Sequence, residues 1–281
     1  VAIQFKGDDD NVISTIVNWG NHPEILDSRN NYVSSDFPHA LREALEDGLP
    51  ATSRYEAEPG FGGVAIFQQG TVGGLVGPNG FLITGRDGTE YENANKTWAR
   101  ADAYGENLAQ QAFDALKNAT IIENPRLFFA AKAFKIPVEN IIFHLGLLTG
   151  WFDREVYDYN PNEFLEEGNF PHLLTEVGVI RLGPLTWSTA PGELFPESFV
   201  GFDEVQSMGL PQVDANNPNP PDLTQAPTGP TIKSQMQSDF PMIFGLGQDE
   251  IGYLVPPYDF ILDESSPYID EAEGDHYEET N

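Results

Sequence analysis

His22 is the histidine in this sequence that is best placed to do chemistry. The chain has five histidines, and none forms a His-x-His or His-Glu-x-x-His pair, so local spacing indicates no metal site. His22 follows a β-branched, apolar stretch, and α/β proteins place reactive groups just beyond the carboxyl ends of such strands. A turn histidine bonded to nearby backbone explains the same pattern. Of the others, His144 lies in an apolar run typical of a core, and His39 and His172 lie beside prolines typical of a surface.

Two further polar segments each follow a predicted strand. In Pro191-Gly192-Glu193, the glycine lets the backbone turn, and the carboxylate could bind a metal or act as a base. The alternative is a glutamate at the start of a helix over 194–202, where the helix dipole favours it. The segment from Gly245 to Tyr253 is acidic and ends in a tyrosine. Its alternative is an ordinary acidic loop with a packed tyrosine.

A glycine-rich turn over 70–78 follows another predicted strand. It lacks the Gly-Lys-Ser/Thr ending of a phosphate loop, and few basic residues lie near it, so nucleotide binding is excluded. The sequence has no Gly-x-Ser-x-Gly motif, which argues against the nucleophile elbow of an α/β-hydrolase. The triplet Asp8-Asp9-Asp10 lacks the spaced ligands of a calcium loop and predicts a solvated hairpin turn instead.

These residues are positioned by alternating strands and helices. Hydrophobic patterns predict helices that open at Asp36-Phe37-Pro38 and span 98–117. The predicted strands are 12–19, the buried one before His22, then 63–68, 127–134, 176–182, 185–190 and 240–246. A Pro- and Asn-rich excursion covers 214–230, and an acidic tail covers 263–281. The sequence therefore predicts a single α/β domain over 1–281, with mixed β-sheets flanked by helices.

The amino-acid composition excludes several kinds of partner and of reactive site. With 14 Lys and Arg against 44 Asp and Glu in 281 residues, the formal charge is −30, which excludes nucleic acid and anionic membranes as electrostatic partners. The acid excess fits a secreted, periplasmic or cell-surface protein. The absence of cysteine excludes disulfides, thiolate zinc sites and cysteine nucleophiles. No apolar run is long enough for a transmembrane helix, and the start at Val1 suggests a trimmed or processed chain.

Taken in order, the polar segments resemble the catalytic domain of the neutral/alkaline non-lysosomal ceramidase family. The closest likeness is to bacterial members without a C-terminal immunoglobulin-like domain, with the N-terminal part of the catalytic domain missing. The segments that carry the resemblance are Asn18-Trp19-Gly20-Asn21-His22-Pro23, Ser34-Ser35-Asp36, Gly77-Pro78, Pro191-Gly192-Glu193, Gly245-Leu246 through Tyr253, and Tyr277-Glu278.

This resemblance implies a zinc ion held by His22, Glu193 and Tyr253. The family's fourth ligand, a second histidine, lies in an upstream segment that has no counterpart here, so an N-terminal fragment of the same protein is an expected partner. Ca²⁺ and Mg²⁺ are further candidate metals. The family's serine is missing from the glycine turn, whose sequence at 73–78 contains no Asp or Ser. We therefore expect zinc-activated water as the nucleophile, with the backbone N–H groups of Gly73 and Gly74 as candidate oxyanion donors.

Two functions follow from these observations. The first is a secreted zinc-dependent hydrolase of the neutral ceramidase type, which cleaves an amide or ester of a small molecule or a lipid such as a sphingolipid. The second is a non-catalytic, ceramidase-like surface or filament-forming protein that has kept the fold and lost part of the site. A homo-oligomer is compatible with both.

Overall fold

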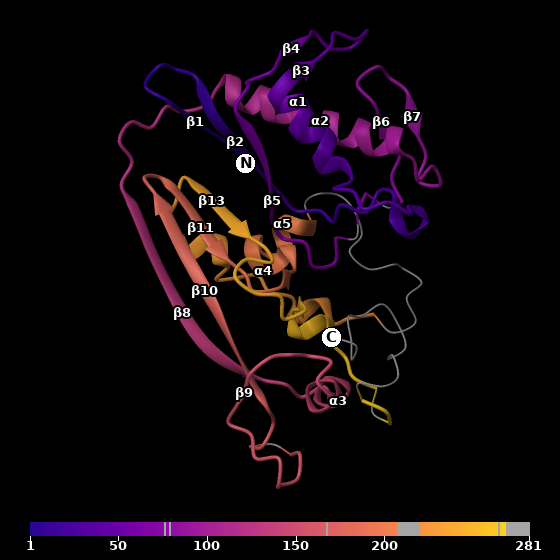
Figure 1. Ribbon diagram of the computed structural model, residues 1–281, viewed down its shortest axis with the longest axis vertical. Helices are drawn as coiled ribbons and strands as arrows, with labels where there is room; N and C mark the ends of the chain where they lie inside the picture. The colour runs from indigo at the N-terminus through magenta and orange to yellow at the C-terminus, as the bar shows by residue number, and fades with distance from the viewer. Residues whose placement is uncertain (76, 79, 167, 207–219, 264, 268–281) are drawn as a thin grey trace. The chain divides into compact units, whose positions relative to one another are not determined.

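The computed structural model describes residues 1–75, 77, 78, 80–166, 168–206, 220–263 and 265–267 (Figure 1). The chain divides into two units, Val1–Pro125 and Arg126–Asn281, and each is described by itself. Such a division is compatible with one domain or with two, so the single domain over 1–281 stays a prediction.

A three-stranded sheet of order β1–β2–β5 forms the centre of the first unit. The strands β1 (Ala2–Lys6) and β2 (Val12–Trp19) form an antiparallel hairpin, and Asp8, Asp9 and Asp10 lie in its exposed turn, as predicted. Strand β5 (Val64–Gln69) runs parallel to β2, which requires a crossover connection. Only Thr15 and Val17 of β2 are buried, although the sequence predicts a buried strand, because the helices pack on a single face of this small sheet.

That crossover contains helix α1 (Phe37–Asp47), which packs against α2 (Trp98–Lys117). Asp36 caps α1 through its Oδ1 atom, which accepts a hydrogen bond from the backbone N–H of Phe37 at 2.7 Å. The helices approach closely at Gly105, where a Cβ atom would overlap the carbonyl oxygen of Phe37. The buried apolar side chains of the first unit gather between these helices and the sheet; they include Val17, Ile25, Phe37, Leu41, Leu45, Leu108 and Phe113.

Short elements complete the first unit. A 3₁₀ turn, η1 (Asp27–Arg29), precedes α1. The two-stranded ladders are β3 (Gly48–Leu49) with β4 (Glu58–Pro59), and β6 (Ile83–Thr84) with β7 (Glu90–Tyr91).

The second unit is built on a mixed sheet of order β13–β11–β10–β8, with β9 (Val156–Tyr157) paired to one end of β10. Strands β8 (Leu127–Pro137) and β10 (His172–Leu182) are long antiparallel neighbours (Figure 1). Strand β11 (Leu185–Thr189) is antiparallel to β10 and parallel to β13 (Phe240–Phe244). Next to this sheet, β12 (Glu193–Leu194) and β14 (Tyr253–Leu254) form a separate parallel pair.

Short helices connect the strands of the second unit. They are α3 (Ile141–Thr149), α4 (Pro196–Val200), α5 (Phe202–Gln206), η2 (Leu223–Gln225), α6 (Ile232–Gln235) and η3 (Pro257–Asp259). Of the helical stretch considered over 194–202, Pro196–Val200 forms α4 and Phe202 begins α5; Leu194 belongs to β12, and Gly201 with φ 97° separates the two helices. Residues 214–219 of the predicted excursion, and residues 264 and 268–281 of the tail, lie outside the described part of the chain.

Together these elements confirm the predicted mixed α/β class. Among the described residues, none of the helices combines the length and the apolar character needed to cross a membrane.

Candidate functional site

Two segments predicted to carry chemistry lie side by side in the second unit. Backbone hydrogen bonds join the stretch 190–193 to the stretch 244–252: Ala190 N–H donates to Phe244, Gly247 N–H to Ala190, Ile251 N–H to Pro191 and Glu193 N–H to Gly252, each at 2.9 Å. Gly192 permits this approach, because a Cβ atom there would overlap the carbonyl oxygen of Gly252. Because glycine at position 192 lets the two backbones approach, the carboxylate of Glu193 lies next to the acidic loop.

Glu193 and Tyr253 face each other at the start of the parallel strands β12 and β14. Their Cα atoms are register partners in this ladder. Residues at the same level of adjacent parallel strands lie about 4.8 Å apart and direct their side chains to the same face. Glu193 is half-buried and Tyr253 is 37% exposed. Glu193 thus belongs to a strand, not to the helix start that the sequence left open, because α4 begins only at Pro196.

The loop before Tyr253 is held by an ion pair that sequence reasoning missed. Arg154 donates from Nη1 and Nη2 to the two carboxylate oxygens of Asp249, at 3.1 and 2.9 Å. Burial alone would raise the pKa of Asp249, but the hydrogen bonds from Arg154 bring it below its ordinary value. The neighbouring Gln248 is hydrogen-bonded to Thr189 of β11 and to Glu176 of β10. These contacts join residues distant in sequence, so no local pattern could have predicted them.

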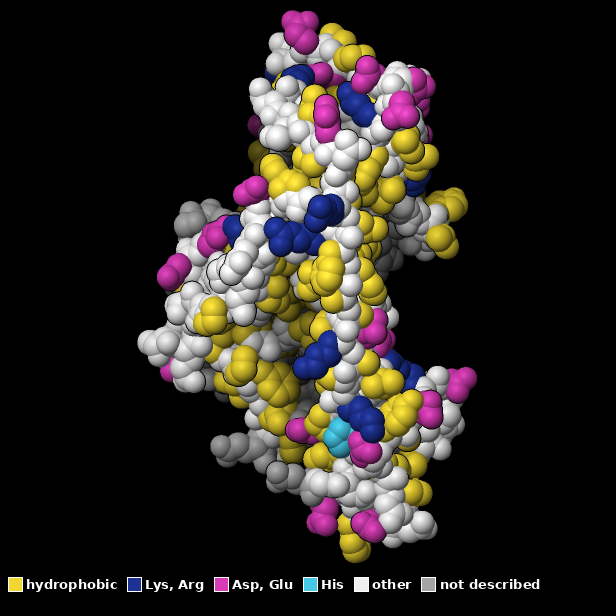
Figure 2. Space-filling model, turned by 90° about the vertical axis from the view of Figure 1, so that its left-hand side faces the viewer, with side chains coloured by type: hydrophobic (Ala, Val, Ile, Leu, Met, Phe, Trp, Pro, Cys, Tyr) yellow, Lys and Arg dark blue, Asp and Glu magenta, His cyan; other side chains and the backbone are white. Residues whose placement is uncertain are grey.

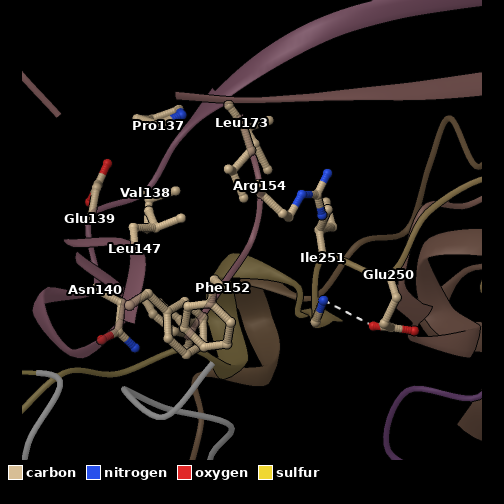
Figure 3. Close-up of a pocket in the computed structure, with 14 residues that line it drawn as sticks. Pro137, Val138, Glu139, Asn140, Leu147, Phe152, Arg154, Leu173, Glu250 and Ile251 are labelled. Atoms are coloured by element: carbon tan, nitrogen blue, oxygen red, sulfur yellow. Dashed lines mark hydrogen bonds between the residues drawn. The ribbon is translucent and has the colours of Figure 1, made fainter. Parts of the chain in front are cut away.

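A largely apolar cavity of about 410 Å³ borders this loop (Figure 3). It extends along the loop as far as Gly252, the residue that precedes Tyr253. Figure 3 shows Val138, Leu147 and Phe152 on one side and Ile251 and Glu250 on the other. A cavity of this size and character accommodates a small apolar ligand or part of a larger one.

A second buried carboxyl group lies a few residues after Glu193. Glu197 of α4 is only 6% exposed, and burial raises its pKa above the ordinary value. The hydroxyl of Tyr258 donates to its Oε1 atom at 2.9 Å. This pair links α4 to η3, and no pattern in the sequence predicts it.

In the first unit, His22 lies against the glycine turn. Its backbone N–H donates to the carbonyl of Leu75 at 3.1 Å, and its Nδ1 atom lies 3.8 Å from Oε1 of Glu24. Gly70 N–H donates to Trp19 at 2.8 Å, and a Cβ atom on Gly20 would overlap the carbonyl oxygen of Thr71. The His22 side chain is 17% exposed. The backbone contact that the sequence offered as an alternative is therefore present, and the imidazole faces the carboxylate of Glu24.

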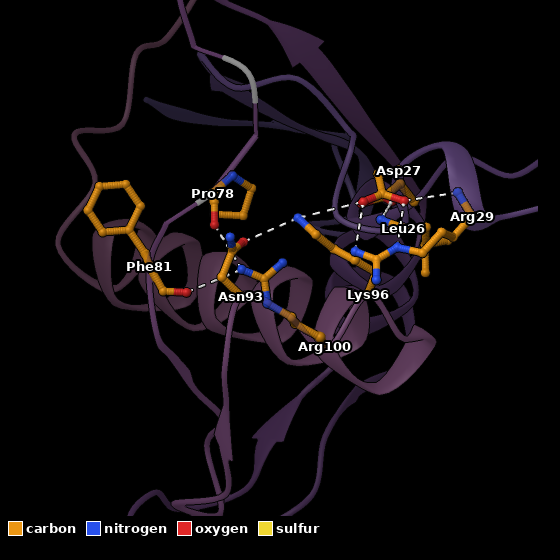
Figure 4. Close-up of polar contacts among 9 residues, drawn as sticks. Leu26, Asp27, Arg29, Pro78, Phe81, Asn93, Lys96 and Arg100 are labelled. Atoms are coloured by element: carbon orange, nitrogen blue, oxygen red, sulfur yellow. Dashed lines mark hydrogen bonds and ion pairs between the residues drawn. The ribbon is translucent and has the colours of Figure 1, made fainter. Parts of the chain in front are cut away.

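The glycine turn is anchored from α2 by a buried arginine (Figure 4). Arg100 is fully buried, and its Nη2 atom donates to the carbonyls of Pro78 and Phe81 at 2.8 and 3.2 Å. Within the turn, Gly73 is buried, and Gly74 is exposed with φ 73°. Nearby, Lys96 approaches Asp27 at 3.9 Å and donates to Asn93 at 3.2 Å. The turn thus has fixed ends, as a set of preorganised backbone N–H donors requires.

The structure also shows the surroundings of the other candidate residues. His144 is buried and hydrogen-bonded to the carbonyl of Val138, as expected of a core histidine. His39 is exposed near Glu43, as expected of a surface histidine, whereas His172 is half-buried in β10. Asp36 is buried and used for capping and for a bond from Leu26 N–H at 2.9 Å. The segment Tyr277-Glu278 lies outside the described residues.

The structure therefore brings Glu193 to Tyr253 in one unit and His22 to the glycine turn in the other. That all three predicted ligands share one metal stays a prediction. In the described part of the chain, no three His, Cys, Asp or Glu side chains gather closely enough to hold a metal ion. The predicted set contains a phenol, which is outside those types. A neutral imidazole with carboxylate and phenolate oxygens is a donor set whose chemistry fits zinc.

Comparisons with known proteins find similar structures but no similar sequences. No protein-family model matches the chain, and no curated protein sequence matches it. The crystal structure of neutral ceramidase from Pseudomonas aeruginosa is similar, with a TM-score of 0.54 and 12% sequence identity over 92% of this chain and 40% of that chain. A ceramidase complexed with C2 has a TM-score of 0.49 and 14% identity over 90% of this chain and 41% of that one.

At this identity the likeness to the Pseudomonas structure shows the fold alone. The chain spans about 40% of the length of that ceramidase, and its mixed α/β architecture resembles the corresponding part of the neutral ceramidase fold.

Proposed function

We propose that this protein is a zinc-dependent hydrolase that cleaves an amide or ester bond, as neutral ceramidases do. The observation that carries the proposal is the pairing of Glu193 with Tyr253 across β12 and β14, on a fold that resembles a ceramidase. The proposal includes a secreted, periplasmic or cell-surface location, supported by the excess of acidic residues.

The residues that would hold zinc are Glu193 and Tyr253, together with His22. When bound, zinc would lower the pKa of a coordinated water toward neutrality and polarise the carbonyl of the substrate. Glu193 contributes a carboxylate oxygen, and its backbone N–H bond to Gly252 fixes the strand that carries it. Gly73 and Gly74 contribute backbone N–H groups that could donate to a developing oxyanion.

The cavity beside the loop supports a substrate with an apolar part. Its lining is mainly aliphatic and aromatic, and it extends to the residue before Tyr253. Its polar side chains include Arg154, which is already paired with Asp249. An acyl chain or a comparable apolar group is therefore a better occupant than a charged one.

The test is hydrolysis of fluorogenic N-acyl amides and esters of increasing acyl length, with zinc and after chelation. We expect zinc-dependent cleavage that Glu193→Gln reduces by a hundredfold or so. Glu43→Gln, which alters an exposed carboxylate on α1, is the matched control and keeps the parent activity. Equal activity of Glu193→Gln and the parent, or no cleavage of any substrate by the zinc-loaded protein, would overturn the proposal.

One observation favours the second candidate function, a non-catalytic protein. The glycine turn has no Asp or Ser over 70–78, and Thr71 is its only hydroxyl residue. A protein that kept the fold without catalysis would contain no tightly bound zinc and would assemble into regular fibres or layers. Metal analysis combined with electron microscopy distinguishes the two functions.

A further inference from the structure

Strand β8 forms an open edge of the sheet in the second unit. Among the described residues, the sheet order places β8 at the end, where it pairs on one side with β10 and has no strand on the other. All seven side chains from Leu127 to Ala133 are exposed, which means that both faces of the strand are uncovered; Phe128 and Phe129 are 59% and 61% exposed. Natural sheets normally shorten, charge or cover an edge of this kind, because its unpaired N–H and C=O groups accept another strand.

This edge is also where positive charge gathers. Arg126, Lys132 and Lys135 are the only three successive basic residues in the chain that have no Asp or Glu between them. Lys135 pairs with Asp158 at 2.8 Å. Arg126 and Lys132 have no ion-pair partner among the described residues. Figure 2 shows Lys and Arg side chains along the uncovered strand with hydrophobic ones between them. In a chain of net charge −30, such a strand attracts carboxylates.

The chain contains a segment with the complementary composition. Residues 268–281, which lie outside the described part, carry six acidic residues and no Lys or Arg; the acids are Asp270, Glu271, Glu273, Asp275, Glu278 and Glu279. The segment also has three large apolar or aromatic side chains, Tyr268, Ile269 and Tyr277. It therefore combines carboxylates for the basic residues of β8 with apolar groups for its phenylalanines.

Length and position are compatible with docking in the same molecule. Phe260 lines the same cavity as Ile136 and Pro137, so the chain that leads to the tail passes the carboxyl end of β8. From Phe260 the eight residues to Tyr268 can span about 27 Å. The 11 residues of β8 extend over about 37 Å, and the 14-residue tail can cover that length. A tail that begins at the carboxyl end of β8 and follows the strand back toward Leu127 would run antiparallel to it.

We propose that the acidic tail, residues 268–281, docks on the open edge of β8 in the same molecule as an added antiparallel strand. Main-chain hydrogen bonds supply affinity in this mode of recognition, and charge and side-chain contacts supply specificity. Attachment through a short linker raises the effective concentration of the tail at the edge to the millimolar range.

The experiment is amide hydrogen exchange, read by mass spectrometry, on the full chain and on a chain that ends at Pro267. We expect exchange of peptides covering 127–137 to become about tenfold faster or more when the tail is removed, while peptides from α2 keep their rates. The double variant Arg126→Glu with Lys132→Glu should show the same acceleration with the tail present. Lys6→Glu, an exposed lysine on β1, is the control and should leave β8 unchanged.

Three outcomes would overturn the proposal. Equal exchange of β8 with and without the tail means that the tail does not cover this edge. Protection that disappears on dilution of the full chain means that a second copy covers β8. Protection that survives charge reversal at Arg126 and Lys132 means that charge complementarity does not select the occupant. A synthetic 268–281 peptide added to the shortened chain should restore protection at low salt and lose it in 1 M NaCl, where the Debye length is about 3 Å.

Discussion

Glu193 and Tyr253 are register partners at the first position of the parallel strands β12 and β14. The ladder is only two residues long, so its geometry depends on the backbone hydrogen bonds that join 190–193 to 244–252. A carboxylate and a phenol that lie far apart in sequence are thereby placed on one face. The proposed chemistry depends on this relationship. The following predictions concern the contacts that maintain it and the packing within each of the two units.

Gly192→Ala should loosen β12 from β14. The added methyl group would overlap the carbonyl oxygen of Gly252, and that atom belongs to the backbone, so the strands must separate. We expect a loss of about 1–3 kcal/mol in the free energy of unfolding, measured by urea denaturation. Gly7→Ala is the control, because the atom nearest to its added methyl group belongs to the exposed side chain of Asp9 and not to the backbone. Equal stability of the two variants would contradict the close packing at Gly192.

Arg154→Met should destabilise the loop that carries Asp249. It removes the two hydrogen bonds to Asp249 and a longer one to the carbonyl of Leu174, and it leaves a mostly buried carboxylate without its cation, which costs roughly 1–3 kcal/mol at neutral pH. Because the folded pKa of Asp249 is lowered, the stabilisation is present above its unfolded pKa of about 3.9 and is lost as the pH falls through the folded value.

The difference between parent and Arg154→Met should therefore shrink in acid, as measured by urea midpoints between pH 2 and pH 7. Lys233→Met, which breaks the exposed pair with Glu204, should cost under about 1 kcal/mol. A pH-independent difference for Arg154→Met would show that Arg154 acts by packing alone.

Glu197→Gln should change how stability depends on pH. Burial raises the folded pKa of Glu197 above its unfolded value of about 4.3. Stability from this group is therefore fully present below the unfolded pKa and is lost as the pH rises through the folded pKa. The neutral amide avoids that loss, so the variant should gain stability relative to the parent between pH 4 and pH 8.

The measurement for Glu197 is the urea midpoint of parent and variant across that pH range. Glu43→Gln on the exposed face of α1 should show no such trend. A constant difference between Glu197→Gln and the parent would mean that Glu197 does not titrate with a raised pKa.

Asp36→Ala should destabilise the first unit by about 2 kcal/mol. It removes the cap of α1 and the acceptor for Leu26 N–H, and it places alanine at φ 54°. Asp36→Asn keeps an acceptor oxygen and tolerates that φ, so it should cost distinctly less in thermal unfolding. If alanine and asparagine cost the same, then neither the cap nor the bond to Leu26 contributes.

Much of the fold could be predicted because the long elements carry their own patterns. Strand β2 and helix α2 have the predicted ends, and α1 follows from Asp36, Pro38 and Gly48. The two-residue strands could not be predicted, since their pairing depends on distant partners. Strand β10 begins at His172, four residues before the predicted start, because β8 continues to Pro137 and pairs with it.

The candidate site was predictable only in pieces. Glu193 and Tyr253 each follow a strand, which the sequence shows, but their pairing arises from the close approach at Gly192 and Gly252. The ion pair of Arg154 with Asp249 and the bond of Tyr258 to Glu197 connect segments with no shared motif. Such contacts depend on how the whole chain folds, so hydrophobic periodicity and helix-capping patterns cannot predict them.

The most direct test of the account is zinc binding by the full chain, measured by competition with a chromogenic chelator. We predict about one zinc per chain, and at least tenfold weaker binding in Glu193→Gln, Tyr253→Phe and His22→Ala. The exposed His39→Ala should bind zinc as the parent does. A chain that binds no zinc, or one whose affinity is unchanged by Glu193→Gln and Tyr253→Phe, would contradict the central claim.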